Sequence, residues 1–172
     1  PGNKSGFRPD YPSIVYTKIL KDLFPEVPVI LGGIESSLRR VTHYDYWQDK
    51  LKPSILVDSK ADMLIYGMGE LPLREVLKLM VKGVPIENLT NIPQTSILRP
   101  LTEPVPLVKK WHTVTLFSHD ECLTDKKKYA RNFRYIEEES NKMQSGRIYQ
   151  NVASDVIIVK PPYPPMSEEE MD

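Results

Sequence analysis

The sequence is poor in cysteine, with a single thiol at Cys122 among 172 residues. One thiol cannot form an intrachain disulfide, a structural zinc site or a cysteine-ligated iron–sulfur cluster. The neighbouring carboxylates of Asp120, Glu121 and Asp125 are expected to raise the pKa of Cys122, which argues against a thiolate nucleophile. We therefore expect Cys122 to be a helix residue that faces the core.

Net charge and long apolar runs are also lacking. The 23 basic and 23 acidic side chains cancel, so the chain lacks the overall electrostatic footprint of a nucleic-acid binder. The basic run at residues 126–128 is typical of a solvated helix face. No apolar run approaches the roughly 20 residues of a membrane span, and no secretory signal pattern is present. The expectation is a cytoplasmic protein with neither a membrane nor a nucleic-acid partner.

What is present suits one domain, or one domain with a small extension, because 40% of the residues are hydrophobic and 27% are charged. Both ends suggest an excised fragment. Residues 1–6 form a loop with no element before it, and Ser167 followed by acidic residues is typical of a helix beginning.

Two apolar strands are each predicted to end at glycines that lead into a helix. The first strand covers residues 27–31 and the second covers residues 61–66. The glycines are Gly32 and Gly33 after the first strand, and Gly67 and Gly69 after the second. Unbroken apolar runs suit strands covered on both faces, as in parallel sheets, where the carboxyl ends of the strands share one edge. The two turns are therefore expected to face one crevice, although such turns also serve chain reversal alone.

The remaining pattern predicts an α/β fold, with an open, mostly parallel sheet of Rossmann type and flanking helices. A helix over residues 12–24 carries an apolar stripe and implies a partner strand before residue 1. Residues 94–98 favour an edge strand. The carboxyl-terminal extension comprises a strand at residues 113–117, a helix from the capping box of Ser118 and Glu121 to about residue 141, and a hairpin at residues 148–159. We divide the chain into an α/β domain (1–98) and a proline-rich connection, helix and hairpin (99–172).

Ionisable side chains cluster near the two glycine turns. The candidate ligand-binding residues are Gly32, Gly33, Glu35, Arg39, Arg40, His43, Gly67, Gly69 and Glu70. Arginines and aromatic rings could hold an anionic or aromatic ligand through charge-assisted bonds and stacking. The competing interpretation is a packed aromatic patch in which Arg39 or Arg40 pairs with Asp45. In that interpretation His43 is a hydrogen-bonded packing residue, and Glu35 and Glu70 merely complement helix dipoles.

Several motifs resemble those of the YgiQ-type radical SAM proteins. They are ILGGIE at residues 30–35, SLRR at 37–40, HYDYW at 43–47, DSKAD at 58–62 and YGMGE at 66–70, followed by the later runs at 125–130, 161–162 and 167–172. The resemblance covers nearly the whole chain. It implies an amino-terminal domain similar to the cobalamin-binding fold, placed before a radical SAM barrel. In that family a three-cysteine loop of the barrel holds a 4Fe–4S cluster, which reductively cleaves S-adenosylmethionine.

By the same resemblance, Gly32 and Gly33 correspond to the double glycine of cobalamin-binding-like domains, and residues 62–70 to their later strand and glycine–acid turn. The sequence departs from the family in lacking the three-cysteine motif, so this chain cannot carry the cluster. The histidine motif that ligates cobalt would lie before residue 1, so cobalamin binding is unsupported.

The resemblance therefore implies an accessory domain that is not catalytic alone and that lines or covers the active site of its own parent barrel. The barrel would use the 4Fe–4S cluster and S-adenosylmethionine on a small or macromolecular substrate that the residues do not specify. A structural docking module with no small-molecule site is the alternative. A free-standing nucleotide-binding protein is a third hypothesis, but the chain has neither a P-loop nor a Gly-x-Gly-x-x-Gly turn.

Overall fold

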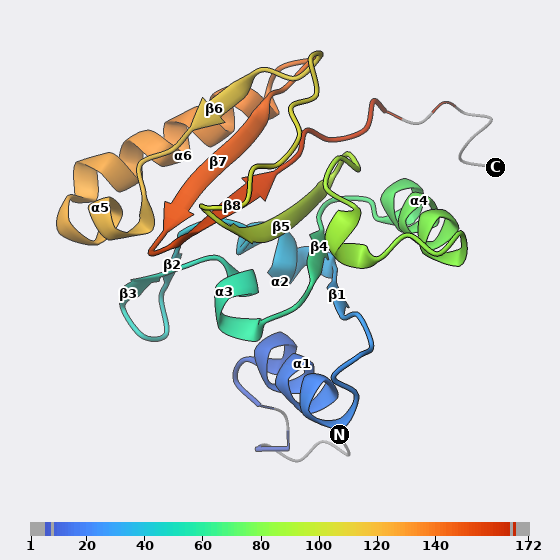
Figure 1. Cartoon of the computed structure of the whole chain (residues 1–172). Helices are drawn as coiled ribbons and strands as arrows, with labels where there is room; N and C mark the ends of the chain where they lie inside the picture. Colours follow the sequence, from blue (N-terminus) through green and yellow to red (C-terminus); the bar gives the residue numbers. More distant parts are fainter. Residues whose placement is uncertain (1–5, 8, 166, 168–172) are drawn as a thin grey trace.

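The computed structural model describes residues 6, 7, 9–165 and 167. Within these residues a mixed six-stranded sheet has the order β1-β4-β5-β8-β7-β6, and a separate two-stranded sheet pairs β2 with β3 (Figure 1). The strands are β1 (Ile30–Leu31), β2 (His43–Asp45), β3 (Lys50–Lys52), β4 (Met63–Ile65), β5 (Thr95–Pro100), β6 (Thr113–Thr115), β7 (Arg147–Val152) and β8 (Asp155–Val159). The helices are α1 (Pro12–Leu23), α2 (Gly33–Leu38), α3 (Ile55–Ser59), α4 (Glu70–Val81), the 3-10 turn η1 (Ile86–Asn88), α5 (His119–Thr124) and α6 (Lys126–Ser140).

The strands on which the predicted site depends run the same way. β1 pairs in parallel with β4, with Ile30 opposite Met63. β6 and β7 are also parallel, whereas β5 is antiparallel to both of its neighbours, and β7 and β8 form an antiparallel hairpin. The predicted α/β class, with helices flanking a sheet, is therefore confirmed.

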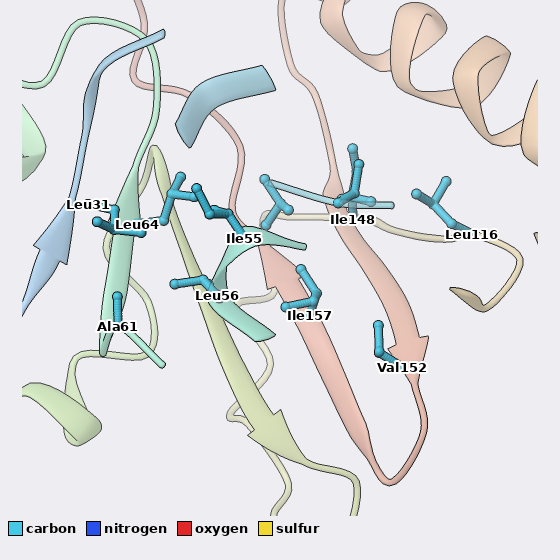
Figure 2. Close-up of a cluster of buried hydrophobic side chains, with 11 residues drawn as sticks. Leu31, Ile55, Leu56, Ala61, Leu64, Leu116, Ile148, Val152 and Ile157 are labelled. Atoms are coloured by element: carbon cyan, nitrogen blue, oxygen red, sulfur yellow. The ribbon is translucent and has the colours of Figure 1, made fainter. Parts of the chain in front are cut away.

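The sheet is covered on both faces because its central strands carry apolar side chains at successive positions. Leu64 of β4 and Ile157 of β8 belong to one buried cluster, which includes Ile55 and Leu56 of α3 (Figure 2). The intervening side chains, such as Ile158, point to a second cluster that includes side chains of α4 and η1. Successive strand residues point to opposite faces, so an unbroken apolar run fills two cores at once.

Two sequence-based expectations about single elements are wrong. The predicted edge strand at residues 94–98 is β5, which lies between β4 and β8. The predicted helix from Ser118 to residue 141 is broken at Asp125, whose backbone is extended (φ −137°, ψ 103°). The Asp125 side chain accepts a hydrogen bond from the Lys127 amide at 2.8 Å, and so caps α6 as a second helix. The capping box that begins α5 is present as predicted.

Helix α1 shows an unusual distribution of polarity. Its one fully buried side chain is Thr17, whereas apolar side chains on its outer face are exposed. Polar contacts attach the helix to the domain, including the hydrogen bond from the Ser13 hydroxyl to Glu35 at 2.5 Å and the ion pair between Lys21 and Asp62 at 2.5 Å. The predicted apolar stripe exists, but most of it faces away from the described core.

At the far edge of the sheet, β6 approaches the start of β7 very closely. A Cβ atom at Gly146 would lie 2.6 Å from the ring of His112 and 2.7 Å from its carbonyl oxygen. The buried carboxylate of Glu139, on α6, accepts hydrogen bonds from the Gly146 amide at 2.7 Å and lies 3.0 Å from Nε2 of His112. One carboxylate thus joins α6, β6 and β7.

Two further expectations concern the ends and the membrane. The helix start predicted at Ser167 lies outside the described residues, apart from Ser167 itself. Among the described residues, no helix combines the length and apolar character that a membrane crossing requires.

Candidate functional site

The two glycine turns lie side by side at the carboxyl edge of β1 and β4. Gly33 has a left-handed backbone (φ +83°), and a Cβ atom at either Gly32 or Gly33 would meet nothing within 4 Å. Gly67 is also left-handed (φ +66°), and its amide donates a hydrogen bond to the Ser37 hydroxyl of α2 at 3.1 Å. The structure therefore brings the turns together as the parallel pairing requires, and leaves open space over the first one.

A small pocket of about 250 Å³ adjoins the second turn. Its lining residues are Tyr66, Gly67, Met68, Leu71, Gln94 and Pro162–Pro165. The Gln94 side chain donates to the carbonyl of Met68 and accepts from the Tyr163 amide at 3.3 Å. The proline-rich segment that follows β8 is thereby held against the glycine turn.

Arg40 is a predicted charged residue whose side chain contacts Tyr66 and Ser37 near this edge. Its guanidinium stacks 5.1 Å from the centre of the Tyr66 ring and donates to the carbonyl of Ser37. Burial lowers the pKa of Arg40 and raises that of Tyr66. The Tyr66 hydroxyl donates to the carbonyl of Lys160, so Tyr66 links the turn to the end of β8. A half-buried guanidinium with few partners is suited to an anion, although none of its contacts reaches Gly32 or Gly33.

Arg39 and His43 lie in a different pocket, of about 280 Å³, between α1, α3 and the β2–β3 hairpin. Its lining residues are Tyr11, Ile14, Val15, Lys18, Arg39, His43, Asp45, Gln48, Lys52, Ile55 and Asp58. Arg39 pairs with Glu35 at 2.9 Å and stacks 5.7 Å from the centre of the Tyr11 ring. The predicted alternative pairing of Arg39 or Arg40 with Asp45 does not form among the described ion pairs.

The electrostatics of this second pocket are set by hydrogen bonds. Burial lowers the pKa of His43, and its Nδ1 lies 3.2 Å from the carbonyl of Val41. Nδ1 therefore carries the proton of the neutral ring, and Nε2 keeps its lone pair. Burial opposes ionisation of Asp45, but the Tyr11 hydroxyl at 2.8 Å and the amides of Gln48 and Trp47 outweigh it and lower the pKa of this carboxyl.

The nine candidate residues thus divide into two groups. The turn glycines and Arg40 lie at the sheet edge, with Glu70 exposed at the start of α4, whereas Arg39 and His43 line the second pocket beside Glu35. Sequence reasoning missed Tyr11, Lys18 and Lys52 as pocket residues. No local pattern joins these positions, since they come together only when α1 packs against α3 and the hairpin forms.

The described residues do not fit an iron–sulfur cluster or another metal centre. No group of three or more His, Cys, Asp or Glu side chains gathers there in an arrangement that could hold a metal ion. Cys122 is buried, and burial together with Glu121 and Asp125 raises the pKa of its thiol. Both expectations for this residue, its core position and its raised pKa, are confirmed.

Within the described residues, the paired glycine turns open at one edge of a mixed sheet in an α/β domain. The family model described as "Radical SAM N-terminal" matches residues 1–172, and the chain belongs to this family. The family resemblance seen in the motifs is therefore confirmed.

Relatives show how much of a longer protein the chain represents. It is 57% identical to a UPF0313 protein of Porphyromonas gingivalis, of which it covers 27%, and 54% identical to one of Bacteroides thetaiotaomicron, of which it covers 29%. A UPF0313 protein of Geobacter sulfurreducens is 38% identical, with 28% covered. All three alignments span the whole of this chain, which therefore represents less than a third of each relative. No solved structure matches the chain.

Proposed function

We propose that this chain is an accessory domain of a radical SAM, 4Fe–4S enzyme, and that its glycine edge lines or covers the active site of the remaining polypeptide. The single observation that carries the proposal is the pair of glycine turns at one edge of parallel strands, in a chain of the radical SAM N-terminal family. Ligands of open α/β sheets bind outside the carboxyl ends of the strands.

The surface of this edge supports the same role. Ile34 and Leu38 lie one helical turn apart on α2 and are exposed, and Met68, in the second turn, is 64% exposed. Exposed apolar side chains beside open glycine turns favour contact with another protein surface. The bound cluster would supply one-electron cleavage of S-adenosylmethionine, and it would be held by cysteines of the remaining polypeptide. This chain's own residues would exclude water and hold the substrate.

Arg40 is the residue we expect to contact the substrate or S-adenosylmethionine. Its guanidinium is fixed by the Tyr66 ring and the Ser37 carbonyl, so it is already oriented before a ligand arrives. A preoriented guanidinium loses little side-chain entropy when it binds a carboxylate or phosphate. The opposing docking hypothesis is favoured by the separation of Arg39 and His43 from the turns, but not by the position of Arg40.

The full-length protein, reconstituted anaerobically with iron and sulfide, provides the test. Reduced protein is expected to release 5′-deoxyadenosine from S-adenosylmethionine. In the same preparation, hydroxyl-radical footprinting compares Met68 with Met143, which is 94% exposed and lies beyond α6. Slow oxidation of Met68 beside fast oxidation of Met143 is expected if the glycine edge is covered. Equal rates, or no cleavage of S-adenosylmethionine, would contradict the proposal.

A further inference from the structure

The outer face of α1 is apolar and has no partner among the described residues. Ile19, Leu20 and Leu23 of α1 and the capping residue Phe24 are exposed, Leu23 to 66%, while Thr17 on the inner side is 2% exposed. A surface helix of a finished domain normally turns its apolar stripe to the core and its polar residues to solvent. In α1 most of the apolar stripe faces outward instead. Ile14 packs against the buried cluster, and polar contacts to Glu35, Asp45 and Asp62 also hold the helix in place.

The strand that follows α1 also has an unpartnered surface, namely one of its two edges. β1 has two residues and, within the described part of the chain, pairs with β4 alone at the end of the sheet. Val29, just before β1, also bonds on the β4 side. Its amide donates to the Asp62 carboxylate at 2.6 Å, and its carbonyl accepts from the Asp62 amide at 3.0 Å. The opposite edge of β1 is open, and β1 side chains nevertheless pack into both buried clusters.

These two open surfaces adjoin each other, because α1 leads into β1 through residues 24–29 and both lie at the same end of the molecule (Figure 1). A helix that precedes a parallel strand normally crosses over from an earlier strand next to it, and it covers both strands on one face of the sheet. The earlier strand would fill the open edge of β1 and place its side chains against the apolar face of α1.

We propose that a strand of the same polypeptide, lying outside residues 1–172 and preceding α1, adds to the sheet in parallel with β1 and packs under α1. The chain covers 27% of one aligned relative and 29% of another, so each relative has further polypeptide that could supply this strand. A tethered strand meets its site at a high effective concentration, which favours it over a second copy or a separate partner. The inference does not depend on radical SAM activity.

Photocrosslinking in the full-length protein tests which segment packs against the apolar face of α1. The photoreactive residue p-benzoyl-phenylalanine replaces Leu23 in one preparation and, as the control, Val81, which is 88% exposed at the end of α4. Position 23 is expected to cross-link, within one molecule, to a peptide that precedes α1, and position 81 is not. Covalent dimers, cross-links from position 23 only to peptides beyond residue 172, or no cross-link at all would each overturn the proposal.

Amide hydrogen exchange of the same full-length protein tests the strand pairing separately. Alternate residues of a strand direct their amides to opposite edges, so one of the Ile30 and Leu31 amides faces the open edge. Both amides are expected to exchange slowly if a strand pairs there, and one fast amide would overturn the added strand. Loss of 5′-deoxyadenosine release with both results intact would count against the proposed function alone.

Discussion

At the scale of single residues, the described sheet buries positive charge without matching carboxylates. Lys160 is fully buried and its side-chain nitrogen has no hydrogen-bond partner. Arg147, opposite it on β7, donates to the Pro106 carbonyl at 3.2 Å and stacks 5.5 Å from the Tyr149 ring. Burial holds the pKa of Lys160 well below its ordinary value, and the positive charges of Arg99 and Arg147 lower it further. The unpaired side-chain nitrogen of Lys160 therefore costs stability.

Replacing Lys160 by methionine is therefore expected to stabilise the protein. Lys160→Met removes an unpaired buried amine, which costs about 1–3 kcal/mol, and keeps the apolar stem. Because the folded pKa is depressed, the free energy of unfolding of the parent should rise as pH increases toward about 10.4, the value for an unfolded lysine. Urea unfolding at several pH values measures both effects. A variant that is less stable than the parent and keeps its pH slope would contradict the assignment.

Replacing Asp45 is expected to lower stability, because its carboxylate accepts hydrogen bonds from three donors. Asp45→Asn should lower the free energy of unfolding by about 1–3 kcal/mol, since the amide accepts fewer hydrogen bonds from Tyr11, Trp47 and Gln48. The folded pKa is below the unfolded one, so the stabilisation is present above about pH 3.9 and is lost as pH falls through the folded value. Acid unfolding of the parent and the variant should therefore converge at low pH. A gap that persists there would refute this account.

At the scale of elements, the first glycine turn offers a matched pair of substitutions. Gly33 is left-handed, while Gly32 is extended at φ −144°, and both positions are open to solvent. Gly33→Ala should cost about 1–2 kcal/mol through backbone strain alone, and Gly32→Ala should be close to neutral. Thermal unfolding of the two variants measures the difference. Equal melting temperatures would show that the backbone at residue 33 is not held in this conformation.

Most helices and strands follow from local pattern, and the exceptions have physical causes. The capping box at Ser118 and the β7–β8 hairpin lie where sequence signals predict them. Sequence reasoning failed at Asp125, where an aspartate that caps α6 interrupts an otherwise continuous helical spacing. It also failed for β5, because pairing with β8 across 60 residues has no local signal.

The candidate site was predictable to the extent that it depends on strand direction. Parallel pairing of β1 and β4 places the two glycine turns together, as the apolar runs indicated. The directions of Arg39 and Arg40 were not predictable, because adjacent residues after a short helix point to different sides. Arg39 lines the pocket beside α1, whereas Arg40 lines another pocket with Tyr66, Ile136 and Lys160. Whether these residues bind a ligand, and whether residue 98 marks a domain boundary, stay predictions.

At the scale of the whole molecule, the apolar face of α1 should make the 172-residue chain associate with itself when it is produced alone. Sedimentation velocity is expected to show concentration-dependent oligomers. Leu23→Glu should weaken this association about tenfold or more, since burying one leucine contributes about 1.5–3 kcal/mol. Val81→Glu, at a more exposed site on α4, is the control and should have little effect. A parent chain that stays monomeric at all concentrations would show that the apolar face of α1 does not drive self-association.

The close approach at Gly146 has a consequence for how the protein behaves in a crowded solution. No side chain can be added there without forcing His112, and with it β6, away from β7. The edge of β7 that pairs with β6 would then expose unpaired N–H and C=O groups. Such groups can pair with strands of neighbouring molecules and begin aggregation. Gly146→Ala is therefore expected to loosen the pairing of β6 with β7 and to increase aggregation.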